Sequence, residues 1–138
     1  MLVMGILNAT PDSFADGGEH FTYPDAVDHG LKLIVEGADI IDVGGESTRP
    51  GAERVSAAEE ERRVINVISK LVDAGKQISI DTMRASTARA AVIAGASIIN
   101  DVSGGLADAA MLDTAAELKV PYIAMHWRGQ SKDMNSMA

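Results

Sequence analysis

The sequence has no cysteine among its 138 residues. This absence excludes disulfide frameworks and thiolate metal sites, and it removes thiol nucleophiles from the mechanisms open to the chain. Apolar residues make up 46% of the chain and charged residues 23%, which is ordinary for a soluble globular protein. Because a chain of this length can bury roughly two-thirds of its unfolded surface, we expect a single domain over residues 1–138.

Long apolar runs and basic clusters are also absent. No stretch approaches the roughly 18 apolar residues of a membrane span. The opening run from Met1 to Leu7 has no basic residues before it and no cleavage site after it, so we expect a strand and a cytoplasmic protein. Twelve basic residues against twenty acidic ones give a net charge of −8, which argues against a nucleic-acid partner.

Short apolar segments alternate with segments of helical periodicity. Ser56 and Glu59 form an S-x-x-E capping box before the clearest helical stripe, which ends near Gly75. The acidic run Glu59 to Glu61 falls in that first turn, where a solvated face explains it better than catalysis. Strands are expected at 1–8, 39–43, 77–81, 97–101 and 120–126. Helices are expected along the stripe Val27, Leu31, Ile34, Val35 and Ala38, after Ser56, over 85–94, and from a cap at Asp108 to Leu118.

This alternation predicts βαβ units and one parallel sheet, with consecutive strands side by side. In such folds the ligand lies at the carboxyl ends of the strands. Neither G-x-G-x-x-G nor G-x-x-x-x-G-K-[ST] occurs where a nucleotide site needs it. The three histidines lack close ligand spacing, which argues against zinc, and His29 is expected to be exposed. Unusual polar residues follow the expected strands at Asn8, Gly44 to Glu46, Asp81, Asn100 and His126.

Four segments resemble the dihydropteroate synthases. They read GILNATPDSFADGG at 5–18, GADIIDVGGESTRPGA at 37–52, SIDTMR at 79–84 with IINDVSGG at 98–105, and MHWRG at 125–129. The resemblance covers essentially the whole chain and implies a (β/α)₈ TIM barrel of the pterin-binding type. Because such a barrel needs about 250 residues, we expect its N-terminal half here, with four βα units and a fifth strand.

The resemblance implies a transferase of folate biosynthesis. It would condense 6-hydroxymethyl-7,8-dihydropterin diphosphate with 4-aminobenzoate to give 7,8-dihydropteroate and diphosphate, and it would be a sulfonamide target. Asp81, Asn100 and Met125 would bind the pterin. An N-cap role explains Asp81 equally well from position alone, and a turn explains Asn100. We interpret Asp42 and Asp101, which can also face the barrel interior, as structural.

The diphosphate and the second substrate would be held by the loops. Thr48 and Arg49 would act on the leaving diphosphate, and Asn8 would supply an oxygen ligand to Mg²⁺. Phe14 and Pro50 would flank the 4-aminobenzoate ring. From position alone, Thr48 and Arg49 are ordinary surface loop residues.

Two other functions stay open. A non-catalytic pterin-binding fragment fits a half barrel. A corrinoid-type methyltransferase domain has similar pterin-binding strand ends, but it should lack the TPDSFADGG and ESTRPG loops. We expect the full-length enzyme to be a homodimer with small-molecule substrates and without nucleic-acid or membrane partners.

Overall fold

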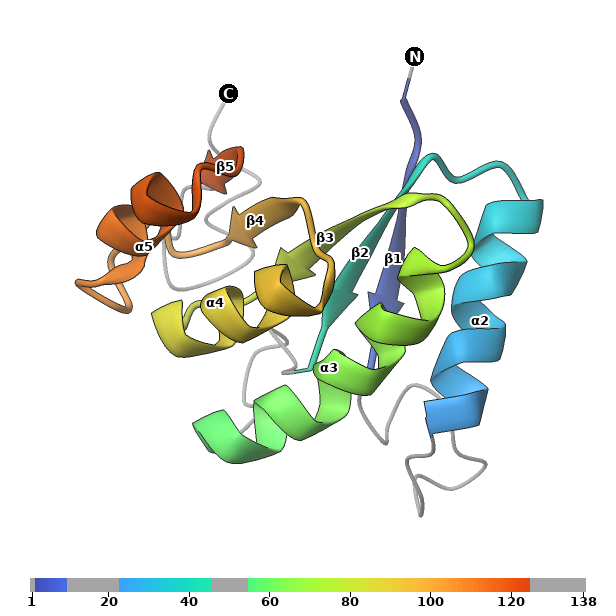
Figure 1. Ribbon diagram of the computed structural model, residues 1–138, viewed down its shortest axis with the longest axis horizontal. Coiled ribbons are helices and arrows are strands. Elements are labelled where there is room, and N and C mark those ends of the chain that lie inside the picture. The colour runs from blue at the N-terminus through green and yellow to red at the C-terminus, as the bar shows by residue number, and fades with distance from the viewer. Residues whose placement is uncertain (1, 10–22, 46–54, 125–138) are drawn as a thin grey trace, which may run out of the picture.

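The computed structural model describes residues 2–9, 23–45 and 55–124. Within these ranges strands and helices alternate strictly (Figure 1). The strands are β1 (Met4–Asn8), β2 (Ile40–Gly44), β3 (Gln77–Asp81), β4 (Ile98–Asp101) and β5 (Tyr122–Ala124). The helices are α2 (Tyr23–Val35), α3 (Ala57–Val72), α4 (Ala85–Ala94) and α5 (Met111–Leu118).

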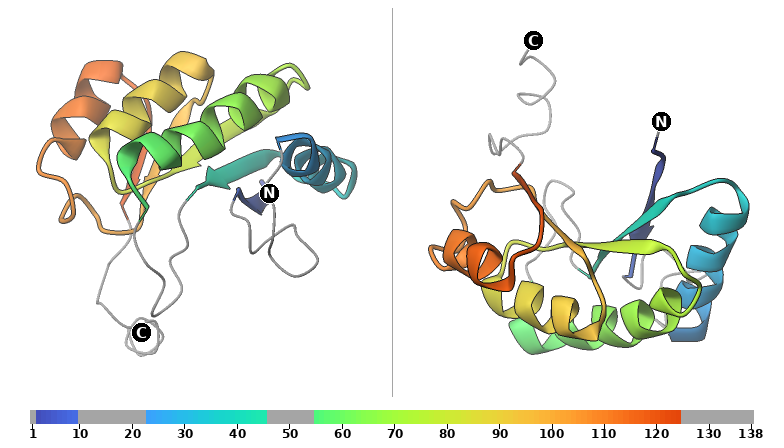
Figure 2. Two further views of the ribbon diagram at one scale, coloured as in Figure 1. Left: turned by 90° about the horizontal axis from the view of Figure 1, so that it is seen from below. Right: turned by 45° about the horizontal axis from the view of Figure 1, so that its top comes forward.

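The strands form one parallel sheet in the order β1-β2-β3-β4-β5. This is the predicted order, and it follows from short βαβ connections that place sequential strands side by side. The strands follow an arc with the helices on its outer side (Figure 2). No helix in the described part of the chain is both long and apolar enough to cross a membrane.

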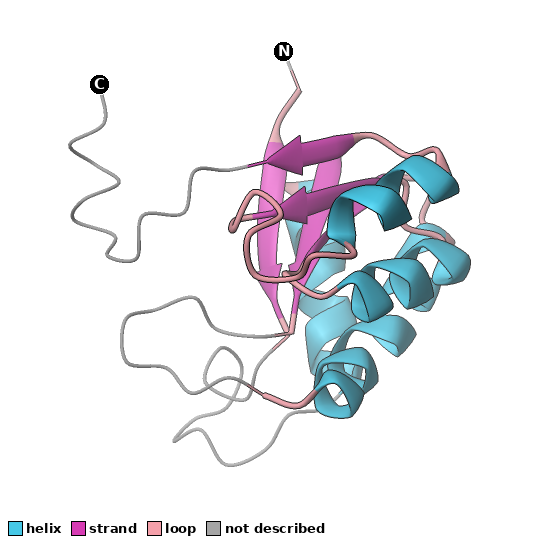
Figure 3. Ribbon diagram, turned by 90° about the vertical axis from the view of Figure 1, so that its left-hand side faces the viewer, coloured by secondary structure: helices cyan, strands magenta, loops and turns pink. Residues whose placement is uncertain are grey.

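The core lies between the sheet and the helices. Leu7, Val43, Ile80 and Ile99 are each 0% exposed and belong to one apolar cluster with helix residues. Each such side chain contributes roughly 1.5–3 kcal/mol through burial. The helices lie on one side of the sheet (Figure 3). Since side chains alternate along a strand, the intervening residues face the other side, which is the inside of the arc.

Helix α3 begins and ends as the sequence predicts. The Ser56 hydroxyl accepts a hydrogen bond from the Glu59 backbone N–H at 3.1 Å, which caps the first turn. The helix buries an apolar stripe that includes Val64 and Leu71. The chain leaves the helix through Gly75, whose φ of +82° suits glycine. The hydrogen bond to Ser56 confirms the hydroxyl half of the predicted capping box. The Glu59 carboxylate binds Arg62 and Arg63.

The predicted stripe of α2 is wrong in part. Val35 is 86% exposed and Leu31 41% exposed, whereas Ala26 is 0% exposed. The buried face passes through Gly30, where an added Cβ would lie 2.7 Å from Leu71 Cδ1. A search for large apolar residues misses this face because close packing of α2 against α3 requires small ones.

Asp108 does not cap α5 in the predicted way. The N-cap residue of α5 is Ala110, which makes no side-chain cap. The two Asp108 carboxylate oxygens instead accept from Ala110 N at 2.9 Å and from Ala85 N at 2.7 Å. Asp108 therefore caps the start of α4, whose own N-cap residue Arg84 provides no side-chain cap. The last strand also begins two residues later than predicted, because pairing with β4 starts at Tyr122.

The inner face and both edges of the sheet predict that the 138-residue chain associates when it is alone. Ile6 is 53% exposed and Ile123 40% exposed, and β1 and β5 each pair on one side only within the described residues. Open strand edges beside an exposed apolar surface favour self-association. Size-exclusion chromatography with light scattering should report oligomers or aggregates. A stable, folded monomer would contradict this expectation.

Candidate functional site

One row of residues crosses the sheet at the carboxyl ends of the strands. The register pairs Asn8 with Gly44, Gly44 with Asp81, Asp81 with Asn100 and Asn100 with Ile123. Residues paired across parallel strands point to the same face, and here that face is the inside of the arc. The structure therefore places Asn8, Asp81 and Asn100 in one row at the carboxyl ends of the strands.

Gly44 leaves room in the middle of this row. A Cβ at this position would lie 3.4 Å from both Cβ and Oδ2 of Asp81. Any larger side chain would therefore crowd the Asp81 carboxylate. Asn8 is exposed on the other side of Gly44, and the strand end is held by the hydrogen bond from Ala9 N to Gly44 O at 2.6 Å.

A second polar layer lies on the same face of the sheet, two residues before the row along β2 and β3. This layer was not predicted from the sequence as part of the site. Asp42 pairs with Ser79 in the sheet register and is 2% exposed. One Asp42 oxygen accepts from the Ser79 hydroxyl, and the other accepts from Asn100 Nδ2 at 3.3 Å. The alternation in DIIDV gave the available signal, because Asp42 has the opposite parity to the buried Ile41 and Val43.

Burial raises the pKa of the Asp42 carboxyl above its ordinary value. The hydrogen bonds from Ser79 and Asn100 lower the pKa and offset only part of this effect. Asn100 is 8% exposed, and its Oδ1 atom has no hydrogen-bond partner among the described residues. Among the described residues, the site thus contains a buried acid with few donors beside an amide oxygen without any.

The two simpler explanations of Asp81 and Asn100 lose their support. At the start of α4, the Arg84 N–H donates to Thr82 Oγ1 at 3.1 Å and the Ala85 N–H donates to Asp108. Other side chains therefore fill the capping role considered for Asp81. Asn100 lies within strand β4 and is buried there, so it is not a turn residue.

Glu60 contradicts the solvated interpretation of the acidic run. It is 1% exposed and accepts from Thr82 Oγ1 at 2.7 Å, Thr87 Oγ1 at 2.8 Å and Arg84 Nη1 at 3.0 Å. These donors come from the end of β3 and the start of α4, so the first turn of α3 faces protein. A carboxylate can be buried there because an ion pair and two hydroxyl groups compensate it.

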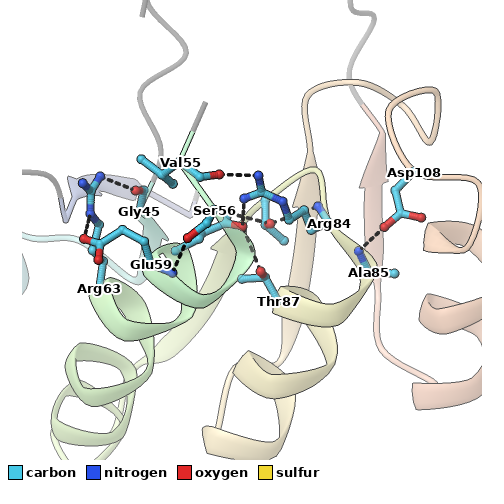
Figure 4. A network of polar contacts seen from close by, with 11 residues as sticks. Gly45, Val55, Ser56, Glu59, Arg63, Arg84, Ala85, Thr87 and Asp108 are labelled. Atoms are coloured by element: carbon cyan, nitrogen blue, oxygen red, sulfur yellow. Dashed lines mark hydrogen bonds and ion pairs between the residues drawn. The ribbon is translucent and has the colours of Figure 1, made fainter. Parts of the chain in front are cut away.

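Two guanidinium groups bind the backbone on either side of the segment 46–54. Arg63 Nη1 donates to Gly45 O at 2.9 Å, and Arg84 Nη2 donates to Val55 O (Figure 4). Arg63 also contacts Glu59, whose pKa is lowered to about 2 by hydrogen bonds from Arg62 and Arg63. Through Arg84, the Glu60 network connects the end of β3 with Val55, whereas Gly45 is bound by Arg63, which pairs with Glu59.

Asp101 lies on the opposite face of the sheet from Asn100. Its carboxylate accepts from the Ser103 N–H at 2.9 Å, the Ser103 hydroxyl at 2.7 Å, the Gly105 N–H at 2.9 Å and the Tyr122 hydroxyl at 2.9 Å. Burial and the hydrogen bond to Asp101 raise the pKa of the Tyr122 hydroxyl. The interior placement considered for Asp101 is therefore wrong, and its structural role is supported.

The remaining predicted site residues lie outside the described residues. They are Phe14, Thr48, Arg49, Pro50 and Met125, and His126 and His20 lie outside as well. His29 is exposed on α2, as predicted.

A family model described as pterin binding enzyme matches residues 4–138. The chain belongs to this family. A curated relative, dihydropteroate synthase of Mycobacterium leprae, is 52% identical over 131 residues, covering 95% of this chain and 46% of the relative. The chain therefore spans about half the length of the curated relatives that it matches.

Solved dihydropteroate synthases share the fold. The Xanthomonas albilineans enzyme with 4-aminobenzoic acid is 54% identical with a TM-score of 0.86, covering 93% of this chain and 47% of that one. The structure of the same enzyme in complex with 7,8-dihydropteroate is 50% identical with a TM-score of 0.76, and the match covers 88% of this chain and 44% of that one. A Yersinia pestis dihydropteroate synthase with a sulfonamide drug is 43% identical with a TM-score of 0.83, covering 98% and 48%. The arc of strands is thus a partial TIM barrel.

The Glu60 network predicts a specific loss of stability. In a full-length version, in which a second half that completes the barrel follows this chain, Thr87→Val keeps the shape of a buried side chain but removes its donor to Glu60. Unfolding in denaturant should show a loss of about 1.5–3 kcal/mol, the scale of a hydrogen bond to a charged group. Thr114→Val is the control, since Thr114 is a buried threonine on α5 outside this network. Equal losses in the two variants would contradict the prediction.

Proposed function

We propose that this chain, as part of a complete barrel, acts as a dihydropteroate synthase. It condenses 6-hydroxymethyl-7,8-dihydropterin diphosphate with 4-aminobenzoate to give 7,8-dihydropteroate and diphosphate. The observation that carries the proposal is the row of Asn8, Asp81 and Asn100 on the inner face of the sheet at its carboxyl edge. The dihydropteroate synthase relatives support the same activity.

The reaction is a substitution at the pterin methylene carbon. The amine nitrogen of 4-aminobenzoate forms a bond to this carbon, the carbon–oxygen bond to the diphosphate breaks, and the nitrogen loses a proton. The amine is neutral near pH 7, so it needs little activation. Orientation of the two substrates and stabilisation of the leaving group then carry most of the catalysis.

Asp81 and Asn100 would recognise the pterin. A pterin has adjacent N–H donors that one carboxylate accepts together, which suits an acid at a strand end. Asn100 offers both an amide donor and an amide acceptor to a heterocycle with mixed edges. Met125 would pack on the pterin face.

Asn8 would take part in binding the diphosphate together with Mg²⁺. The described residues contain no group of three histidine or acidic side chains suited to a metal, whereas Asn8 presents a carbonyl oxygen at the strand end. This fits Mg²⁺, which keeps several waters and binds substrate phosphates in addition to few protein ligands. Bound Mg²⁺ would neutralise charge on the leaving group. Thr48 would hydrogen-bond the diphosphate, and Arg49 would add a positive charge.

A second function is specific to the 138-residue chain alone. Because the chain spans about half the length of its relatives, it has only some of the strand ends that surround the ligand in a full barrel. With an incomplete site, the chain alone would bind a pterin without turnover. We further propose that the full-length enzyme is a cytoplasmic homodimer.

The synthase assay tests the proposed function. The full-length version should release diphosphate only when both substrates and Mg²⁺ are present, and chelation of Mg²⁺ should stop the reaction. The 138-residue chain should give no detectable dihydropteroate. Absence of turnover in the full-length version would reject the proposal.

Asp81→Asn should weaken pterin binding in the full-length version. The substitution removes a charge-assisted hydrogen bond, so we expect a loss on the order of 2 kcal/mol, or roughly thirtyfold in affinity. Isothermal titration calorimetry measures it directly. Asp39→Asn serves as the control, because Asp39 binds the Val3 N–H at the other end of the sheet. Unchanged affinity in Asp81→Asn would remove this residue from the site.

Phe14 and Pro50 should affect the second substrate selectively. Alanine at either position should weaken 4-aminobenzoate and sulfonamide binding, since both ligands share the aromatic ring, and should leave pterin affinity within about twofold. Competition binding with each ligand measures the difference. Similar losses for both ligands would show that these residues support the fold instead of the second pocket.

A further inference from the structure

Asp42 and Asn100 form the least satisfied buried polar pair in the described site. Asp42 accepts from Ser79 and from Asn100 Nδ2, and Asn100 Oδ1 has no partner among the described residues. Both side chains are more than nine-tenths buried. A buried amide oxygen without a hydrogen bond costs free energy, so this arrangement needs an explanation.

The neighbours of an amide decide which way it points. Asn offers two donors at its nitrogen and acceptor sites at its oxygen, whereas an ionised carboxylate can only accept. Asp42 therefore requires the nitrogen of Asn100. The amide oxygen takes the remaining position on the amide carbon and forms no hydrogen bond with Asp42. The Asn100 backbone belongs to the same row as Asp81, where the proposed pterin site lies.

We propose that Asp42 is a positioning residue, which fixes the Asn100 amide so that its oxygen faces the ligand and selects a ligand group that donates an N–H. This inference rests on the proposed function and names a residue that acts through Asn100. Asp42 lies one layer below the ligand-facing row. Its role is to set the hydrogen-bonding polarity of the site.

The substitution Asp42→Asn should reverse this polarity, because the introduced amide offers an acceptor oxygen and a donor nitrogen. If the introduced oxygen accepted from Asn100, the introduced nitrogen would donate to Ser79, and the Ser79 hydroxyl hydrogen would lose its partner. If the introduced oxygen accepts from Ser79, the introduced nitrogen donates to Asn100 Oδ1, so that the Ser79 hydroxyl and the Asn100 oxygen both have partners. The second arrangement turns the Asn100 amide around, so that its nitrogen faces the ligand.

The same substitution should not weaken the fold at neutral pH. Burial raises the Asp42 pKa, so the folded state holds the proton more tightly than the unfolded chain does. The unfolding free energy therefore falls as the pH rises above the ordinary value of 3.8, and the carboxylate destabilises the fold at pH 7. A neutral amide removes this effect. Asp42→Asn should then combine weaker ligand binding with unchanged or higher stability.

Calorimetry with 7,8-dihydropteroate on the full-length version provides the test. Asp42→Asn should lower the affinity at least tenfold, while its unfolding temperature stays at or above that of the wild type. In an Asn100→Ala background, the same substitution should change affinity by less than twofold, because Asp42 acts through Asn100. Affinity for 4-aminobenzoic acid should be unchanged throughout.

Asp101→Asn is the matched control. Asp101 is also fully buried, but it lies on the helix-facing side of the sheet and all of its four recorded donors are N–H or O–H groups. An amide nitrogen would face one of those donors, so stability should fall while the affinity for dihydropteroate stays within twofold.

Wild-type affinity in Asp42→Asn would overturn the inference while leaving the proposed function intact. An equal loss in the Asn100→Ala background would overturn it as well, because Asp42 would then act independently of the amide. Failure of the wild-type protein to bind dihydropteroate would instead reject the proposed function, and the inference with it.

Discussion

The parallel register of the sheet is the constraint on which the rest of the structure depends. Each strand is paired with the next so that Asn8, Gly44, Asp81, Asn100 and Ile123 fall on one line. Since side chains alternate between faces, a slip of one residue in any strand would turn its contribution to this line toward the helices. The buried residues Leu7, Val43, Ile80 and Ile99 oppose such a slip. Burial on the helix side thus fixes the positions of the polar groups on the other side.

Three buried carboxylates show how differently the fold compensates charge. Glu60 has a guanidinium group and two hydroxyl groups, and Asp101 has four N–H and O–H donors. Asp42 has two donors within the described part of the chain and a raised pKa. The fully compensated acids lie at helix and loop junctions, where they stabilise the fold. The less compensated acid lies beneath the proposed ligand site, where stability is commonly exchanged for function.

The sequence was sufficient to predict the alternation, the strand order and the row of polar residues. These features depend on periodicity and on the geometry of parallel sheets, which are local or general. The errors concern contacts between distant segments. Gly30 is buried because Leu71 packs against it, and Glu60 is buried because Arg84, from the next βα unit, pairs with it. Neither partner can be identified from the residues beside Gly30 or Glu60.

The site was predicted less completely than the fold. Asn8, Asp81 and Asn100 were predicted because they end strands, whereas Asp42 lies inside a strand and was interpreted as structural. Its parity along β2 indicated the inner face, but the hydrogen bond to Asn100 joins residues 58 positions apart. Only the folded chain brings these two groups together.

The central claim is that the inner-face row at the carboxyl edge binds the pterin. A crystal structure of the full-length version with 7,8-dihydropteroate tests it most directly. The heterocycle should lie within hydrogen-bonding distance of Asp81 and Asn100, and Asn100 Oδ1 should accept from it. A pterin bound elsewhere, or one that leaves both side chains in contact with protein alone, would contradict the account.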